Sequence, residues 1–195
     1  MWTGVLNMEI LNRGPMDPRW QPPPGPPELD PVAASAWLGI RFGVLRLPAH
    51  RMRYLAQHFS DSGHGRTADG RDAPVSITIR HHIDDDLVVD VVTRRDYEDS
   101  TVLDHMWQAV TDYRLADPPE GGDVGAWAHQ YAVRPRPPEE ASQPLALDGA
   151  LIPWRRFNDD QLVVVGTAIA GGFVAIAGPA ELADGFAVEL LPQVS

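Results

Sequence analysis

The chain has 195 residues, of which 44% are hydrophobic, and its formal net charge is −11 with 16 arginines, no lysine and no cysteine. The hydrophobic fraction is sufficient for a folded core. The missing lysine excludes Schiff-base chemistry and a lysine-containing phosphate-binding loop, and the missing cysteine excludes thiol nucleophiles, disulfides and thiolate metal sites.

The charge also bears on the class of partner. The arginines are scattered as singles and pairs, and the chain as a whole is acidic. A nucleic acid or an anionic membrane surface requires clustered positive charge, so we expect neither as a partner. An acidic protein is electrostatically suited to a basic protein partner, although many proteins carry such charge only for solubility.

The first predicted segment is a proline-rich arm over residues 1–35, with eight prolines between residues 15 and 31. Proline holds the backbone near polyproline II, so this arm is extended. It is either a stiff tether or a docking segment in which Trp20, Pro23 and Pro26 contact a partner protein. The N-terminus lacks a basic start and a sustained apolar run, which favours a cytoplasmic protein, and Met1, Met8 and Met16 are alternative starts.

The next segment, residues 36–133, is predicted to be an α+β domain. Alternation favours a strand over 36–47, and Pro48 then starts a helix with apolar residues at Met52, Leu55, Ala56 and Phe59. A hairpin follows over 75–93 with its turn at 84–86, then a helix over 102–114 capped by Asp99 or Ser100, and a strand over 124–133. This order predicts a ferredoxin-like βαββαβ sandwich.

The chain then continues through a proline-containing linker, residues 134–144, into a β-rich segment, residues 145–195. The Asp148-Gly149 turn predicts one hairpin, and strands over 162–170 and 173–177 predict a second. A helical turn over 179–184 and a strand over 186–191 complete a β-meander. This segment is either a subdomain or an extension of the central sheet.

One part of this segment, residues 162–179, contains no charge and approaches the length of a membrane span. The glycines at 171 and 172 divide it into two short runs rich in β-forming residues, and acidic residues flank it. We therefore expect a buried hairpin rather than a membrane segment.

The densest group of potential metal ligands is Arg80 to Asp86, which contains two histidines and three aspartates. The candidate ligands are His82, Asp84 and Asp86. On a strand, His81 and His82 point to opposite faces, and aspartates are favoured in turns for their own hydrogen bonds. We therefore predict no metal and no cofactor.

Candidate catalytic residues are His81 and the adjacent pair Asp104 and His105. A carboxylate and a histidine can act together as a general base. The alternative is structural, because acidic residues in the first turn of a helix interact favourably with its dipole. A further candidate surface is Trp154 with Arg155, which is either a binding edge or the outer face of a strand.

These observations favour a non-catalytic, acidic, cytosolic protein-binding module of the immunity or regulatory type, and the negative charge favours a basic partner protein. The first alternative is a small enzyme or ligand-binding protein that uses histidine and carboxylates in a cleft of the α+β domain. The second is a structural subunit of a larger assembly. The sequence does not determine the oligomeric state.

Overall fold

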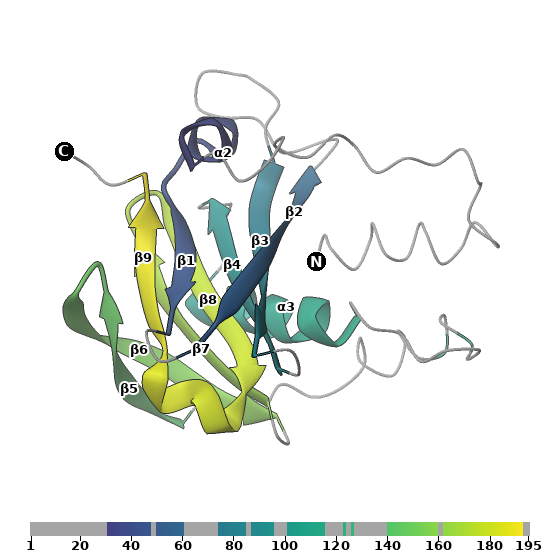
Figure 1. Ribbon diagram of the computed structural model, residues 1–195, viewed down its shortest axis with the longest axis vertical. Coiled ribbons are helices and arrows are strands. Elements are labelled where there is room, and N and C mark those ends of the chain that lie inside the picture. The colour runs from purple at the N-terminus through teal and green to yellow at the C-terminus, as the bar shows by residue number, and fades with distance from the viewer. Residues whose placement is uncertain are drawn as a thin grey trace.

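The computed structural model describes residues 31–47, 50–60, 74–84, 87–95, 101–115, 123, 126, 140–159 and 162–192. These residues form mainly β structure (Figure 1). The helices are α2 (Pro31–Leu38), α3 (Val102–Leu115) and the 3-10 helix η1 (Ala180–Gly185). The strands are β1 (Phe42–Arg46), β2 (Met52–Ser60), β3 (Pro74–Ile83), β4 (Leu87–Arg95), β5 (Glu140–Leu147), β6 (Ala150–Asp159), β7 (Leu162–Ile169), β8 (Gly172–Pro179) and β9 (Ala187–Leu191).

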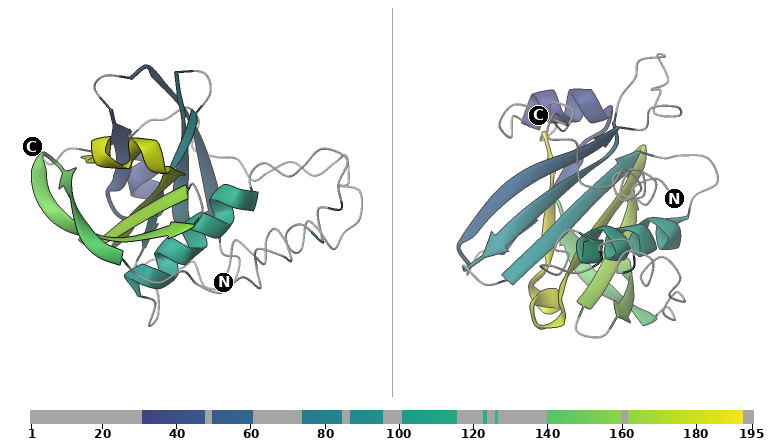
Figure 2. Two further views of the ribbon diagram at one scale, coloured as in Figure 1. Left: turned by 90° about the horizontal axis from the view of Figure 1, so that it is seen from below. Right: turned by 90° about the vertical axis from the view of Figure 1, so that its right-hand side faces the viewer.

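All of these strands belong to one sheet, in the order β1-β9-β5-β6-β7-β8-β4-β3-β2. The pairs are antiparallel except for a short parallel contact between β5 and β9. The sheet is curled into a half-barrel, and α3 lies against its outer side (Figure 2). Strand β1 therefore contacts β3 and β4 across the interior, although β9 is its only pairing partner among the described strands.

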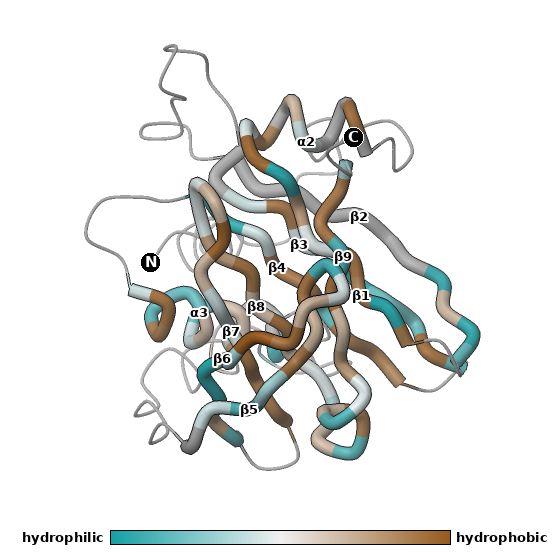
Figure 3. The backbone as a smooth tube through the Cα atoms, turned by 90° about the vertical axis from the view of Figure 1, so that its left-hand side faces the viewer, coloured by the Kyte–Doolittle hydropathy of each residue, from teal (hydrophilic) through white to brown (hydrophobic). Residues whose placement is uncertain are grey.

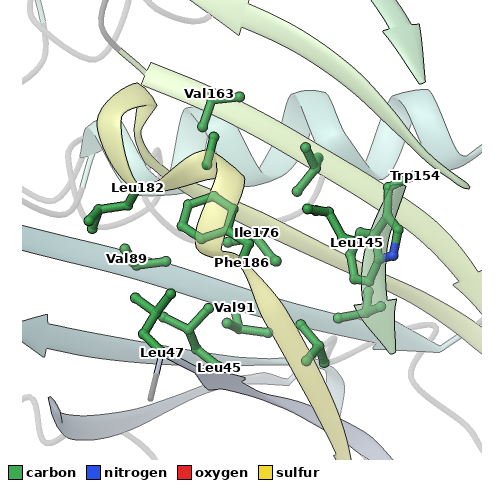
Figure 4. Packing of buried hydrophobic residues seen from close by; sticks show 14 of the residues in the cluster. Leu45, Leu47, Val89, Val91, Leu145, Trp154, Val163, Ile176, Leu182 and Phe186 are labelled. Carbon is green, nitrogen blue, oxygen red and sulfur yellow. The ribbon is translucent and has the colours of Figure 1, made fainter. Parts of the chain in front are cut away.

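The interior of the curl is filled by aliphatic and aromatic side chains from both halves of the sheet. The largest is Trp154, which is fully buried, and Phe186 and Ile176 lie close to the centre of the same cluster (Figure 4). A second cluster lies on the outer side, where Met106 of α3 packs against Phe157 and Val164. Apolar residues thus cover both faces of the central strands, which explains their near-continuous hydrophobic sequences.

The predicted ferredoxin-like βαββαβ sandwich is wrong. The structure is a curled, mainly β half-barrel with few helices, and its C-terminal strands join the central ones through pairing of β8 with β4. A ferredoxin-like fold requires a helix between the first two strands, and the described chain has none there.

The helix expected after Pro48 is replaced by strand β2. Its residues pair with β3 from Met52 opposite Ile83 to Phe59 opposite Ser76. Spacings of three and four in the sequence indicated a helix, but the pairing with β3 satisfies the backbone hydrogen bonds of this segment along one side. Tertiary pairing thus outweighs the local pattern.

The strand expected over 36–47 is also shorter than predicted. Residues 31–38 form α2, whose first residue is Pro31, a favourable position for proline. The helix ends at Gly39, which has a φ of 83° and whose amide donates to the Ser35 carbonyl at 2.7 Å. This left-handed glycine stops the helix, and β1 begins only at Phe42.

Several local predictions are confirmed. The hairpin over 75–93 corresponds to β3 and β4, and the helix over 102–114 corresponds to α3. The Asp148-Gly149 turn joins β5 to β6, and η1 and β9 follow in the predicted order. The strand predicted over 124–133 lies outside the described residues, apart from Ala126, which is helical and not in a strand.

The uncharged stretch over 162–179 forms the hairpin of β7 and β8, paired from Leu162 opposite Pro179 to Ile169 opposite Gly172. Most of its residues are buried between the two apolar clusters. Among the described residues, no helix has the length and apolar character that crossing a membrane would require.

Candidate functional site

The charge of the chain is divided unevenly between the residues that the structure describes and the rest of the sequence. The described residues contain ten arginines and eleven acidic residues, whereas the other segments contain six arginines and sixteen acidic residues. The described part is therefore close to neutral. Nearly all of the net charge of −11 lies in segments that connect or flank the described elements.

At one end of the sheet, at the bottom in Figure 1, several strand ends and the helix η1 lie together. Strand β3 ends and β4 begins there, and the antiparallel register brings the end of β8 beside the start of β4. The turn between β6 and β7 lies at the same end, because Asp159 pairs with Leu162 and Leu162 with Pro179. We call this region the acidic end; the acidic residues described there are Asp84, Glu140, Asp159, Glu181 and Asp184, and Arg51 and Arg53 lie beside Asp84.

Helix η1 presents exposed carboxylates at the acidic end. Glu181 and Asp184 are both exposed, while Leu182 and Ala183 between them are buried. Gln143 fixes this helix, because its Nε2 donates to the Ala183 carbonyl at 3.0 Å and to Asp184 Oδ1 at 3.3 Å. The carboxylates are thus held on an anchored element.

A histidine and a carboxylate come together at the turn between β3 and β4. The Nδ1 of His50 lies 2.7 Å from Asp84 Oδ2, and the Arg51 amide donates to Asp84 Oδ1 at 2.9 Å. These hydrogen bonds lower the pKa of Asp84. The pair borders a small hollow of about 100 Å³ lined by Arg51, Arg53, His82 and Asp84.

The candidate metal ligands do not form a metal site within the described part of the chain. His82 and Asp84 are exposed and line the same hollow, and Asp86 lies outside the described residues. No group of three potential ligands occurs among the residues that the structure describes. Asp84 instead forms part of the turn between β3 and β4, where its backbone φ is 48°.

The candidate base His81 lies inside the sheet. It is fully buried on β3, whereas His82 is exposed, so the two point to opposite faces as the alternation predicts. Its Nδ1 is 3.1 Å from the Ile79 carbonyl oxygen, and burial lowers its pKa to about 4. His81 is therefore neutral and enclosed near neutral pH.

The adjacent candidates His105 and Asp104 are directed to different surroundings. His105 is buried, its ring centroid lies 4.2 Å from that of Phe173, and burial together with the nearby Arg94 lowers its pKa to about 4. Asp104 is exposed and accepts hydrogen bonds from Thr101 N at 2.9 Å and Thr101 Oγ1 at 2.7 Å. Asp104 thus caps α3, and the predicted caps Asp99 and Ser100 are replaced by Thr101.

The candidate partner-binding residues Trp154 and Arg155 also lie on opposite faces of β6. Trp154 is fully buried in the interior cluster, so its indole is part of the core and not of a binding edge. Arg155 is exposed on the opposite face of β6. Trp20, Pro23 and Pro26 lie outside the described residues.

A larger hollow, which the sequence analysis missed, lies beside β1, β9 and β5. Its volume is about 510 Å³. The Asp148-Gly149 turn was the only signal for it in the sequence. Its lining residues are Arg41, Arg46, Ala146, Asp148, Gly149, Ala187, Val188 and Glu189.

Two ion pairs border this hollow, which we call the β5-β9 hollow. Arg41 Nη1 lies 3.1 Å from Asp148 Oδ2, and Arg46 Nε lies 2.6 Å from Glu189 Oε2. Arg41 also donates to the Pro192 carbonyl at 2.8 Å, and Asp148 Oδ1 accepts the Leu190 amide at 2.7 Å. The first pair therefore fastens β9 to the turn between β5 and β6.

We compared the chain with family models, with curated proteins and with solved structures, and none of them matches it.

Proposed function

We propose that this protein is a non-catalytic binding protein whose acidic end recognises a basic region of another protein. The observation that carries the proposal is the charge distribution, in which the described residues are close to neutral and the other segments of the sequence carry most of the negative charge. Concentrated charge of one sign attracts an oppositely charged partner over a Debye length and accelerates encounter. The proposal retains the cytoplasmic location, which fractionation of the native host would test.

The chemistry of the buried groups supports a role in binding over a role in catalysis. His81 and His105 are enclosed and neutral, and Asp104 is engaged in capping α3. A general base must reach the proton that it abstracts, and neither buried imidazole lines a described hollow.

The first experiment is a tagged pull-down from the lysate of the native host, with bound proteins identified and quantified by mass spectrometry. We expect a stoichiometric basic partner. With that partner purified, its dissociation constant measured against NaCl concentration should rise steeply with salt. A partner bound with no salt dependence, or none bound at all, contradicts the proposal.

A pair of matched variants locates the binding site. E181Q/D184N removes two exposed charges of η1 at the acidic end, and E98Q/D99N removes two charges from the segment that joins β4 to α3 in sequence. We expect the first to weaken binding about tenfold, which corresponds to about 1.4 kcal/mol, and the second to weaken it much less. Equal effects would show that only total charge matters and would contradict recognition by the acidic end.

A small-ligand protein is the second candidate, because the His50–Asp84 pair borders a hollow that Arg51 and Arg53 also line. Guanidinium groups favour oxyanions such as phosphate. Titration of inorganic phosphate, monitored by NMR of the His50 ring, tests this alternative. Saturable shifts that disappear in R51A would support it, and unchanged spectra would exclude it.

A further inference from the structure

Four neighbouring strands carry a row of side chains on one face of the sheet. The register places Arg46 opposite Ala187, Ala187 opposite Ala146, and Ala146 opposite Leu151. Side chains of directly opposed residues lie on the same face. The row therefore crosses β1, β9, β5 and β6, which lie side by side in Figure 3.

This row of residues contains both the floor of the β5-β9 hollow and the exposed side chain of Leu151. Ala187 and Ala146 line the β5-β9 hollow, whose volume is about 510 Å³. Leu151, the register partner of Ala146, is 75% exposed. Val32 of α2 is the only other large hydrophobic residue that is exposed among those the structure describes. Exposed Pro144 and Pro153 are opposed on the same hairpin and extend the apolar surface.

This face is not covered by α3. The helix packs on β7, β8 and β4. On β6 it contacts Phe157, which lies on the outer face. Pro153 precedes Phe157 by four residues and therefore lies on the same face of the strand. Pro153 and Leu151 continue the same face of β6 beyond the helix because strand side chains alternate with a period of two. The hairpin of β5 and β6 thus presents an apolar surface that the described helices leave open.

The rim of the hollow carries both signs of charge. Arg41 and Asp148 form one ion pair and Arg46 and Glu189 the other. A two-fold axis places the same rim of a second copy opposite this one, so that acidic and basic groups of the two copies can face each other at both places. A uniformly charged partner would instead meet one repelling group at each place.

We propose that this face is a homodimer interface in which Leu151 of each copy enters the β5-β9 hollow of the other. A two-fold interface uses the same patch on both copies, so that patch must contain both the projecting residue and the cavity that receives it. Leu151 and the hollow satisfy this requirement within one row. The proposal is independent of the acidic end.

Analytical ultracentrifugation of the full chain tests the interface over a concentration series up to about 100 µM, because dimer population depends on protomer concentration. We expect a monomer–dimer equilibrium for the wild type. L151E should weaken the dimer at least tenfold, because a carboxylate would replace an apolar side chain against Ala146 and Ala187 and would lie beside the carboxylates of Asp148 and Glu189. A187W should weaken it comparably, because the indole would fill the hollow from within.

V32E is the matched control, since it places the same charge at the other exposed apolar residue, on α2. It should dimerise as the wild type does. A monomeric wild type at the highest concentration overturns the proposal, as does retention of the dimer by folded L151E or equal weakening by V32E. Circular dichroism confirms folding of each variant, and L151E alone decides the matter if A187W does not fold.

Discussion

Among single residues, Arg80 and Asp90 form the most deeply buried ion pair that the structure describes. Arg80 Nε and Nη2 each lie 2.9 Å from one Asp90 oxygen, and the two side chains are 8% and 3% exposed. Tyr113 of α3 covers the guanidinium, with its ring centroid 5.8 Å away. The bidentate geometry pins the register of β3 against β4 beneath the helix.

Asp90→Ala is expected to reduce the free energy of unfolding by about 3–5 kcal/mol, because it leaves the Arg80 charge buried without its carboxylate. The double variant R80M/D90L, which removes both charges, should recover most of that loss. Glu189→Ala, which breaks the more exposed pair with Arg46, should cost only about 0–1 kcal/mol. Urea unfolding measures all three, and similar losses for D90A and E189A would contradict the assignment.

The buried histidines give the molecule a defined response to acid. Folding lowers the pKa of His81 and of His105 from 6.5 to about 4. Between these values the unfolded chain binds more protons than the folded chain, so stability falls as the pH falls through 6.5 and continues to fall down to about 4. Each histidine should account for about 2 kcal/mol of loss between pH 7.5 and 5.

His105→Phe retains an aromatic ring against Phe173 but removes the titrating group. Its free energy of unfolding should therefore fall by about 2 kcal/mol less than that of the wild type between pH 7.5 and 5. Urea unfolding at both pH values measures this difference, which a uniform loss of packing does not change. An identical pH dependence for variant and wild type would disprove the role of His105.

At the level of elements, α3 shows how a short motif sets a boundary. Thr101 and Asp104 form a reciprocal cap, in which Thr101 N donates to the carboxylate at 2.9 Å and Asp104 N donates to Thr101 Oγ1 at 3.3 Å. Met106 and Ala109 then face the outer side of the sheet. The cap satisfies amides at the helix start that lack partners within the helix.

Thr101→Ala should reduce the free energy of unfolding by about 1 kcal/mol, the usual cost of losing an N-cap oxygen. Thr101→Ser keeps that oxygen and should remain close to the wild type. Thermal and urea unfolding of the two variants provide the comparison. A serine variant as unstable as the alanine variant would show that the methyl group, and not the cap, matters.

At the scale of the whole molecule, the curl of the sheet depends on close approach at β1. A Cβ atom on Gly43 would lie 2.8 Å from Val174 Cγ2 and 2.9 Å from Val188 Cγ1. The Gly43 amide also donates to Thr93 Oγ1 of β4 at 2.8 Å. Glycine at this position allows β1 to lie directly against the interior of the opposite strands.

Gly43→Ala should therefore reduce the free energy of unfolding by about 1–3 kcal/mol through overpacking. Val174→Ala in the same chain removes the nearest contact and should recover part of that loss. The double-mutant cycle, measured by urea unfolding, should give a favourable coupling. Additive losses would mean that Gly43 does not contact Val174 as described.

For the candidate site, the sequence predicts the excess of acidic residues but not where those residues lie in the fold. The excess of acidic residues is visible in the sequence, but its near absence from the helices and strands depends on knowing which residues form them. The β5-β9 hollow brings Arg41 to Asp148 and Arg46 to Glu189, pairs separated by more than a hundred residues. Local patterns contain no information about such contacts.

The sequence by itself determined the hairpins of β3–β4, β5–β6 and β7–β8 and the helix α3, because alternation, turn residues and helical spacing are local signals that agree there. Only the tertiary structure decided that residues 52–60 form a strand, that β1 pairs with β9 and that Trp154 is interior. The physical reason is that backbone hydrogen bonding and burial are satisfied by partners distant in sequence, and these outweigh weak local preferences.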